Sequence, residues 1–383
     1  MANIIYLKST DTYTTIQNAL KKSGYTIVFE AGTYKPTKTF MLYSNTNVVM
    51  QHGAVFQRTT RIPIFQTYVT ADTTGYNGQH DITIHGGTIS SDSCKSFGNL
   101  FNVIHAKNVT IQEFTFEDIP GSHAIEINAS KNIHVINCTF RGYYPNKDGA
   151  YREAIQIDFA NYTALGYEKN KNAKCYDLTH CEDIFIQGCS FVPSTANQAP
   201  TNAIGTHTVT TGDKCHSNIQ IVNNFCYGRG EYNGYGIAFC IENMDNVLIK
   251  NNLCKNYGRF CRIITPSKYY NPDGSTITTE NIKSGSENII ISGNIFEGAG
   301  TLKAGFVYIN NTTNTYHKNI IITDNIFKRG TNNVVCYGVY SKNVDAIISA
   351  HNIFELNKGG VSFNNVNSIY VQTSDYIRSN GDE

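Results

Sequence analysis

The sequence predicts an all-β protein, a parallel β-helix of about ten coils that is closed at its front end by a short helix. Two observations carry this prediction. A nine-residue motif recurs along the chain, and a second short strand precedes each copy of it. The composition agrees, because Asn, Thr, Ile, Tyr and Gly are plentiful while strong helix formers are scarce.

The front end carries the predicted helix. The stretch STDTYTTIQNALKKSG (9–24) is amphipathic, with Ile16 and Leu20 on one face and Gly24 as its stop. A helix over the open end of a solenoid is expected, because an uncovered end exposes apolar surface and unpaired backbone. We expect one domain, with the cap and first strands in 1–40, the coils in 41–371 and a tail in 372–383.

The repeat sets the architecture of the rest of the chain. Its seventh position is Asn from the fourth of the eight main copies onward, and its last position is apolar, mostly Phe or Cys. A recurring Asn predicts a stacked amide ladder, and the apolar position predicts an interior stack, so Cys138, Cys189, Cys226 and Cys254 are expected in the core. The copies are NVTIQEFTF (108–116), NIHVINCTF (132–140), DIFIQGCSF (183–191), NIQIVNNFC (218–226), NVLIKNNLC (246–254), NIIISGNIF (288–296), NIIITDNIF (319–327) and AIISAHNIF (346–354), with DITIHGGTI (81–89) in front.

Charge and hydropathy exclude several partners. The formal net charge is +1 without a basic block, so no nucleic-acid partner is expected. No apolar run approaches the ~18 residues of a membrane helix, and MANIIYLKST does not look like a signal peptide. The eleven cysteines include no C-x-x-C pair, and we expect neither a metal nor a cofactor.

The repeat, together with TIQNAL, VFEAGTY and SNTNVVMQHGAVF, resembles the pectate-lyase-like superfamily of right-handed β-helices. The similarity is greatest to its polygalacturonase-related branch (glycoside hydrolase family 28-like), which includes phage polysaccharide depolymerases. The resemblance implies a right-handed coil and an extracellular or virion-associated protein that acts on polysaccharide, as a monomer or a homotrimer. It does not imply one reaction, because this fold carries hydrolases, lyases and non-catalytic fibres.

Candidate site residues come from three successive strands taken in register: 123–127, 153–157 and 202–206. Ile125, Ile155 and Ile204 are expected to point inward. The outward positions then line up in three short rows: Glu126, Gln156 and Gly205; Asn128, Asp158 and His207; and, at the strand entrance, His123, Glu153 and Asn202. In later coils we expect Ala238, Ile264, Tyr308 and Tyr340 in the row of Glu126, so that the acidity stays local.

Glycoside hydrolysis needs one carboxylic acid and one carboxylate, so Asp158, Glu126 and Glu153 are the candidate catalytic set, assisted by His207. The side chains leave both retaining and inverting separations open. Gln156, Arg152, His123, Asn128, Asn202, Arg229 and Tyr151 are the candidate substrate-binding residues. Each acid also has an alternative, structural interpretation. Asp158 would accept hydrogen bonds from backbone amides of the next turn, and Glu126 would be a solvated outward residue. Glu153 would pair with Arg152 or Lys147.

Insertions mark the same region. The repeat spacing is 24 residues from 114 to 138 but 51 from 138 to 189, and long segments at 161–181, 208–217 and 267–285 leave the same side of their coils. Long loops on a rigid solenoid usually wall a groove. Tyrosines at 143, 144, 151, 167, 269 and 270 are candidate sugar platforms, and Arg229, Arg262 and Lys268 are candidates for acidic sugars.

The chain departs from the polygalacturonase pattern at its motifs. Where that branch has N-T-D, D-D and G-H-G, this sequence has Ser122-His123, Arg152-Glu153 and Thr201-Asn202, and Arg262-Ile263-Ile264 echoes R-I-K only in part. Polygalacturonate hydrolysis therefore does not follow. We expect a glycoside hydrolase acting on a complex polysaccharide. The alternatives are a lyase with Arg152 or His207 as base, and a non-catalytic carbohydrate-binding spike.

Overall fold

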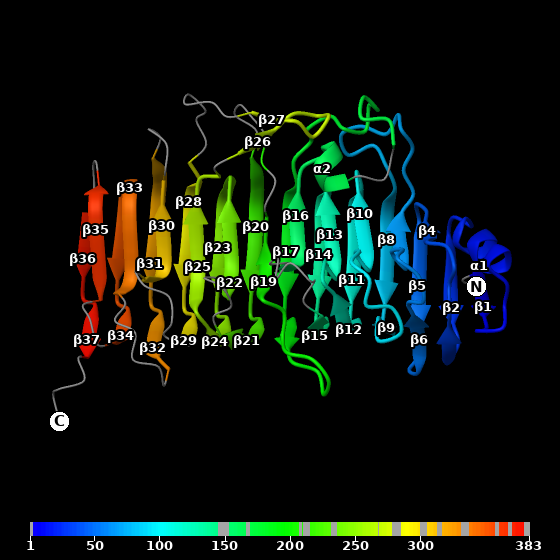
Figure 1. Cartoon of the computed structure of the whole chain (residues 1–383), viewed down its shortest axis with the longest axis horizontal. Helices are drawn as coiled ribbons and strands as arrows, with labels where there is room; N and C mark the ends of the chain where they lie inside the picture. The colour runs from blue at the N-terminus through cyan, green and yellow to red at the C-terminus, as the bar shows by residue number, and fades with distance from the viewer. Residues whose placement is uncertain are drawn as a thin grey trace.

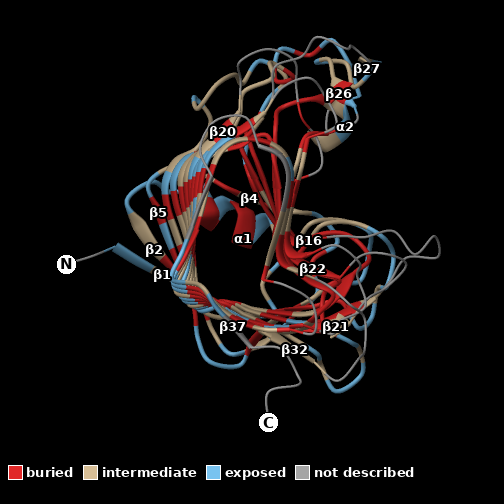
Figure 2. Ribbon diagram, turned by 90° about the vertical axis from the view of Figure 1, so that its left-hand side faces the viewer, coloured by how far each residue is buried: buried red, intermediate tan, exposed pale blue. Residues whose placement is uncertain are grey.

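The structure, a computed structural model, describes residues 3–144, 153–165, 169–206, 209, 215–230, 236–266, 268–277, 285–298, 305–311, 316–330, 337–356, 360–366 and 370–378. Within these ranges the chain winds as a solenoid, and its coils stack in parallel along one long axis (Figure 1). Viewed down that axis, each coil contributes to three rows of strands that enclose the core (Figure 2). The predicted parallel β-helix is confirmed.

The strands fall into the three rows by their pairing. The first row contains β4 (Phe40–Leu42), β7 (Phe65–Thr67), β10 (Phe101–Ile104), β13 (Ile125–Asn128), β16 (Glu153–Asp158), β19 (Asn202–Gly205), β22 (Ile237–Glu242), β25 (Arg259–Ile264), β30 (Gly305–Asn310), the first half of β33 (Tyr337–Ala350) and β35 (Val361–Val366). The second row contains β1 (Asn3–Leu7), β2 (Tyr25–Phe29), β5 (Thr46–Met50), β8 (His80–His85), β11 (Lys107–Gln112), β14 (Lys131–Ile136), β17 (Glu182–Gln187), β20 (His216–Val222), β23 (Met244–Lys250), β28 (Glu287–Ser292), β31 (His317–Thr323), the second half of β33 and β36 (Tyr370–Thr373).

The third row contains β3 (Gly32–Tyr34), β6 (Ala54–Gln57), β9 (Thr88–Ser90), β12 (Thr115–Pro120), β15 (Thr139–Tyr144), β18 (Ser190–Val192), β21 (Phe225–Gly230), β24 (Leu253–Tyr257), β29 (Ile295–Gly298), β32 (Ile326–Arg329), β34 (Ile353–Glu355) and β37 (Tyr376–Arg378). This row holds twelve strands in the described part of the chain, so the ladder is longer than the ten coils expected. The expected coil boundary at 371 falls inside β36, and β37 continues the ladder to Arg378, so the segment taken as a tail begins within the coils.

The predicted interior ladders are present. Asn224, Asn252, Asn294, Asn325 and Asn352 are buried, and each amide donates to the side-chain oxygen of the next, at 2.9–3.0 Å within the five. The predicted Phe stack is also present, with ring centroids 5.0 Å apart for Phe116–Phe140 and 4.7 Å for Phe140–Phe191. Cys138, Cys189, Cys226 and Cys254 are buried in the core, as expected.

The helix α1 (Tyr13–Leu20) caps the N-terminal end of the core (Figure 2). The side chain of Thr12 accepts from the Thr15 backbone N–H at 3.2 Å and so caps the first turn. Ile16 and Leu20 are buried, and the Tyr13 ring stacks on Phe40 at 5.5 Å. The helix ends at Leu20, earlier than the predicted stop. Gly24, with φ of 75°, instead forms the turn into β2.

Two short elements lie outside the three rows. They are α2 (Tyr162–Leu165) and the antiparallel pair β26 (Tyr269–Tyr270) and β27 (Thr276–Ile277). Both belong to segments that leave the end of first-row strands, and they lie together at the top of the molecule in Figures 1 and 2. None of the described helices is long and apolar enough to cross a membrane.

Candidate functional site

The outward positions of the first row form the floor of the candidate site. The register places Glu126 opposite Gln156, Asn128 opposite Asp158, Glu153 opposite Asn202 and Gln156 opposite Gly205, as the sequence predicted. We call the row through Glu126 the floor lane. It runs through Gln66, Asn102, Glu126, Gln156, Gly205, Cys240, Arg262, Tyr308 and Tyr340.

The floor lane corrects one part of the prediction. Ala238 and Ile264 do not lie in it, and Cys240 and Arg262 take their places. Phe239 pairs with Ile204 and occupies the inward position, which moves the outward position of β22 to Cys240. The expectation that the acidity stays local to the three predicted coils is therefore wrong, because Glu242 lies in the lane beside the floor lane; Arg262 lies in the floor lane itself.

Glu126 is held by two side-chain amides. Asn128 Nδ2 donates to Glu126 Oε1 at 3.2 Å, and Asn99 Nδ2 donates to Oε2. Asn99 is itself fixed by the Ser122 hydroxyl, which donates to its Oδ1 at 2.6 Å. Both amides donate to the carboxylate, so together they fix its orientation.

Glu153 reaches from the strand entrance into the floor lane. An added Cβ on Gly205 would lie 3.1 Å from Glu153 Cγ, so the Glu153 side chain passes over Gly205. Its carboxylate accepts from Asn202 Nδ2 at 3.1 Å, and its backbone carbonyl accepts from His123 Nδ1 at 2.7 Å. The predicted substrate-binding residues His123 and Asn202 thus position Glu153.

Asp158 is enclosed, with no exposed surface. Thr206 Oγ1 donates to Asp158 Oδ1 at 2.8 Å and Gln156 Nε2 donates to Oδ2, while Gln156 is also fully buried. Glu126 and Glu153 each keep 6% of their surface exposed. Of the three predicted acids, only the two glutamates have any surface that a substrate can reach.

Glu242 is an acid that the sequence interpretation missed. It lies in the same lane as Asp158 and forms an ion pair with Arg262, Nη2 to Oε1 at 2.9 Å. Burial, and then the charges of Asp158 and Glu242, raise the pKa of Tyr270, which belongs to a loop. Aligning Phe239 with the inward Ile204 was the sequence signal that would have placed Glu242 beside Asp158.

Arg259 adds a buried cation next to this pair. Its guanidinium carbon lies 4.4 Å from the centre of the Tyr308 ring, and its Nε donates to the Gly305 carbonyl at 3.1 Å. Burial, and then the neighbouring Arg262, lower the pKa of Arg259 to about 10. Tyr308 also stacks on Tyr340, with ring centroids 5.6 Å apart. The C-terminal half of the floor is therefore cationic and aromatic, whereas its N-terminal half is acidic.

Loops from distant parts of the sequence form one wall beside the floor. We call the described residues of 68–79, 159–181 and 268–277, with Val209, the lobe. Their backbones are bonded to one another: Tyr162 N–H donates to Pro272 O at 2.9 Å, Cys175 N–H to Ala71 O at 3.0 Å, and Tyr270 N–H to Val209 O at 2.9 Å. The predicted loops at 161–181, 208–217 and 267–285 thus contribute to one structure, joined by 68–79, which the sequence did not suggest.

His105 ties the lobe to the first row. It is fully buried, and its Nδ1 and Nε2 lie 2.7 Å from the carbonyl oxygens of Gly75 and Cys175 respectively. This residue was not singled out from the sequence, since its two partners come from separate loops.

Several predicted residues lie elsewhere. Arg229 is half-buried on β21 in the third row, not on the floor. Tyr143 and Tyr269 are buried and cannot serve as sugar platforms as the structure stands, while Tyr144 and Tyr270 are half-buried. Lys268 is exposed on the lobe. Arg152, Tyr151, His207, Lys147 and Tyr167 lie outside the described residues.

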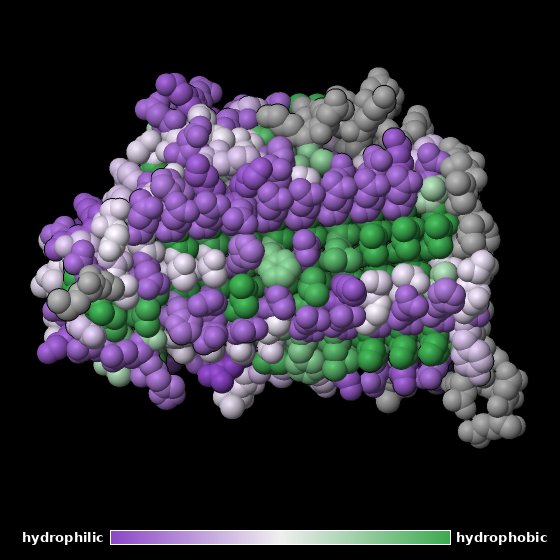
Figure 3. All heavy atoms as spheres, turned by 180° about the vertical axis from the view of Figure 1, so that it is seen from behind, coloured by the Kyte–Doolittle hydropathy of each residue, from purple (hydrophilic) through white to green (hydrophobic). Residues whose placement is uncertain are grey.

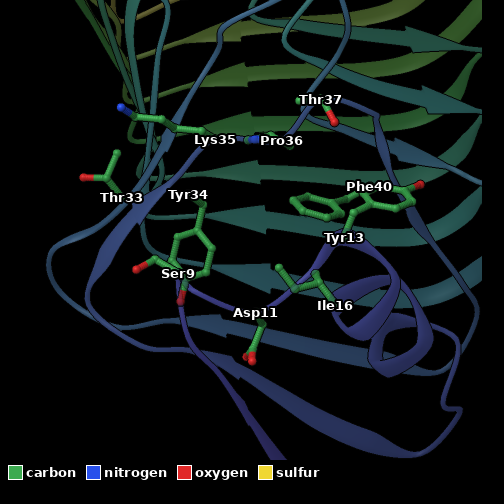
Figure 4. Close-up of a pocket in the computed structure, with 10 residues that line it drawn as sticks. All are labelled: Ser9, Asp11, Tyr13, Ile16, Thr33, Tyr34, Lys35, Pro36, Thr37 and Phe40. Atoms are coloured by element: carbon green, nitrogen blue, oxygen red, sulfur yellow. The ribbon is translucent and has the colours of Figure 1, made fainter.

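A separate pocket opens at the N-terminal end, beside α1 (Figure 4). It has a volume of about 290 Å³, a floor of Ile16, Tyr34 and Phe40, and a polar rim that includes Asp11 and Lys35. It contains none of the floor-lane acids. No group of three or more His, Cys, Asp or Glu side chains among the described residues is arranged to hold a metal ion.

Known proteins share this fold. The chain is 27% identical over 311 residues to plasmin and fibronectin-binding protein A of Streptococcus pneumoniae, which covers 71% of this chain but 40% of that protein. A crystal structure of this surface adhesin superposes with a TM-score of 0.79 at 20% identity, over 98% of this chain and 90% of that one. No family model matches the chain.

Two polysaccharide-related structures are also similar. The exopolygalacturonase of Thermotoga maritima has a TM-score of 0.65 at 11% identity, over 98% of this chain and 92% of that one. The tailspike protein of E. coli bacteriophage HK620, in complex with a pentasaccharide, has a TM-score of 0.60 at 15% identity, over 94% of this chain and 60% of that one. At these identities the likeness concerns the fold, and it confirms the right-handed, pectate-lyase-like β-helix expected from the resemblance.

Proposed function

We propose that the protein is a glycoside hydrolase that cleaves a complex bacterial-surface or extracellular polysaccharide. The carrying observation is that the side chains of Glu126 and Glu153 flank Gln156 in the floor lane and keep a small exposed surface beside the lobe. The chain would act outside the cell or on a virion, where such a polymer is met. The fold it shares with an exopolygalacturonase and an oligosaccharide-binding tailspike supports this proposal.

The geometry favours an inverting reaction. Glu126 and the Gly205 position covered by Glu153 are two coils apart, about 10 Å along the lane, which is nearer to the separation in inverting than in retaining enzymes. Inverting enzymes place their carboxyl groups about 6.5–9.5 Å apart to admit a water, whereas retaining enzymes need about 5 Å. We assign Glu126, which accepts from two amides, as the general base that activates water, and Glu153, which accepts from one, as the acid that protonates the leaving oxygen.

Asp158 changes role in this proposal. It was the first candidate for catalysis, but its enclosure between Thr206 and Gln156 suits a positioning residue. By accepting from Gln156, it fixes the buried amide that lies between the two glutamates. The proposed roles of His207 and Arg152 as helper or substrate contact rest on the sequence prediction.

The test is an incubation with a panel of bacterial exopolysaccharides and capsules, following reducing ends and the ultraviolet absorbance of unsaturated products. New reducing ends without unsaturation are expected. Glu126→Gln and Glu153→Gln should each lower the rate at least about a hundredfold. The matched control is Glu117→Gln, a carboxylate on the third row that pairs with Arg141, and it should leave the rate unchanged.

Other outcomes would replace the proposal. Unsaturated products would require a lyase, with Arg152 or His207 as its base. Full activity in both glutamine variants would remove Glu126 and Glu153 from catalysis. Asp158→Asn distinguishes a catalytic role of Asp158 from a positioning role, because loss of a positioning residue should alter substrate affinity as well as turnover.

A second candidate function is non-catalytic binding at a cell surface. It is favoured by the 27% identity to an adhesin whose name states that it binds plasmin and fibronectin, and by the enclosure of the floor-lane acids. Binding of glycan or host protein without any new reducing ends would support it over the hydrolase.

A further inference from the structure

Two rows of apolar side chains run along the outer face of the molecule, on the side opposite the candidate site (Figure 3). We call them ladder A, on the second row, and ladder B, on the third row. Ladder A consists of Leu248, Ile290, Ile321 and Ile348, and ladder B of Phe225, Leu253, Ile295, Ile326, Ile353 and Tyr376. Ile290 is 39% and Ile295 41% exposed, which is high for isoleucine.

The fold itself does not require these residues. At the same lane positions in the N-terminal half, ladder A is continued by Thr83, Thr110 and His134, and ladder B by Thr88, Thr115, Thr139 and Ser190. Polar side chains are therefore compatible with the same strand, pairing and row. In the N-terminal half only isolated apolar side chains occupy these lanes among the described residues, namely Ile4 and Phe185 in the lane of A and Val55 in the lane of B. The apolar side chains become continuous in the C-terminal half, and a contiguous exposed apolar patch of this kind marks an interaction surface.

We propose that this face binds a second copy of the same chain in a two-fold dimer, with ladder A of each copy lying on ladder B of the other. The carrying argument is the pitch. Both ladders present one side chain per coil, at a spacing of about 4.8 Å. A surface whose side chains have the same spacing is that of another parallel β-helix. A two-fold axis between the ladders exchanges A and B and brings apolar rungs onto apolar rungs.

The lanes beside the ladders fit this arrangement. Ser292, Thr323 and Ala350 lie between A and B in three successive coils, so small side chains would occupy the neighbourhood of the axis there, whereas Lys250 takes this position beside Leu248. Outside ladder B run charges of alternating sign, in the order Lys255, Glu297, Lys328 and Glu355. Outside ladder A run amides, including Asn246, Asn288 and Asn319. The two-fold places amides against these charges, and since amides both donate and accept, no like charges meet in these two outer lanes.

The size of the face also suits a dimer. The rungs of ladder B extend over about 24 Å, and the lanes from the amides to the charges cover a similar width, which is about 500–600 Å² on each copy. Two such faces bury about 1,000 Å² or more, the lower range of specific interfaces. The apolar centre with its polar rim is the distribution that such interfaces show.

The first test is sedimentation velocity of the full chain at micromolar concentration, where a dimer is expected. Ile321→Lys combined with Ile326→Lys places a charge in each ladder and should weaken association by about tenfold or more. The matched control, Thr110→Lys with Thr115→Lys, adds the same charges to the same two lanes in the N-terminal half and should leave the dimer intact. Thermal unfolding by circular dichroism checks that both variants fold.

The second test probes the position of the axis. Thr323→Cys should form a disulfide-linked dimer under mild oxidation, whereas Gln112→Cys, in the same lane at the other end, should behave like the unmodified chain. A monomer at all concentrations would overturn the proposal. So would a dimer that the Ile321→Lys/Ile326→Lys variant leaves unchanged, or a monomer that uses this face to bind a different protein. None of these outcomes bears on the hydrolase, because the face lies away from the floor lane.

Discussion

Asn294 offers a quantitative test of what holds the coils together. Its Nδ2 group donates to Ile249 O at 2.9 Å, Ser292 O at 3.1 Å and Asn325 Oδ1 at 2.9 Å. Its Oδ1 accepts from the backbone N–H and the side-chain amide of Asn252, at 2.9 and 3.0 Å. The side chain is 1% exposed, so water cannot replace these partners.

Asn294→Ala should therefore be strongly destabilising. It leaves at least two buried backbone groups, the Asn252 N–H and the Ile249 carbonyl, without their partner. Each orphaned group costs about 1–3 kcal/mol, so the free energy of unfolding should fall by about 4 kcal/mol. The assay is urea unfolding followed by far-ultraviolet circular dichroism, with the midpoint and the slope fitted for each variant.

The control is Asn47→Ala. Asn47 also lies on a strand and donates to a neighbouring coil, to Thr26 Oγ1 at 3.3 Å, but it is exposed, so water replaces the bond. Its loss should cost no more than about 0.5 kcal/mol. If Asn294→Ala cost as little as Asn47→Ala, the amide ladder would not be a main source of stability and the apolar stacks would have to supply it.

Two further predictions concern protonation and close packing. Burial lowers the pKa of His317 to about 4, and its Nδ1 accepts the Ser286 N–H at 3.0 Å, so the folded protein binds no proton there while the unfolded chain does. This contribution to stability should therefore be complete above about pH 6.5 and fall by on the order of 3 kcal/mol as the pH drops to 4. Melting curves of His317→Gln should show a weaker dependence of stability on pH, whereas those of the exposed His52→Gln should show the same dependence as the unmodified chain. An equal pH dependence in the two variants would contradict the assignment. Gly205→Ala would set a Cβ 2.7 Å from Cys240 Cβ and against Glu153 Cγ, so it should cost about 1–3 kcal/mol and displace the proposed acid. Turnover should fall together with stability, and adding Cys240→Gly should restore stability in part. Unchanged stability of Gly205→Ala would show that the neighbouring side chains move aside without a loss of free energy.

The core could be predicted because every coil repeats it. Asn at one position and Phe or Cys at another recur with the coil, so the amide ladder and the Phe stack followed directly from the sequence. The register around Glu126, Gln156 and Gly205 followed for the same reason, since two of these strands have an alternating Ile pair and the third has Ile204 at the matching position.

The register of two later strands could not be assigned in this way. In β22 and β25 apolar residues are adjacent, as in Ala238-Phe239 and Ile263-Ile264, so alternation alone does not say which one points inward. Packing decides it: Phe239 fills the place of Ile204, and Ile263 is fully buried. The outward assignment then shifts, which is why Glu242 was missed and Arg262 was not placed in the floor lane.

The burial of the candidate acids could not be predicted either, because it depends on contacts between loops far apart in the sequence. Residue 162 meets 272, and residue 175 meets 71. The sequence indicated that insertions follow the acids, but no local pattern states which insertion meets which. The enclosure of Asp158, and the preference for Glu126 and Glu153 that follows from it, belong to tertiary structure alone.

Outward lanes are the informative part of such a solenoid. Inward positions are constrained to apolar or amide side chains in every coil, so they carry little information on function. Outward positions accept Thr, Ser or Asn, as the N-terminal half of ladders A and B shows, and a departure from these residues needs another cause. On one side the departure is acidic and lies under a lobe of loops. On the opposite side it is aliphatic and bare. Because charge beneath loops suits a small polar ligand and bare aliphatic rungs suit a packed protein surface, the two faces are best explained by different partners.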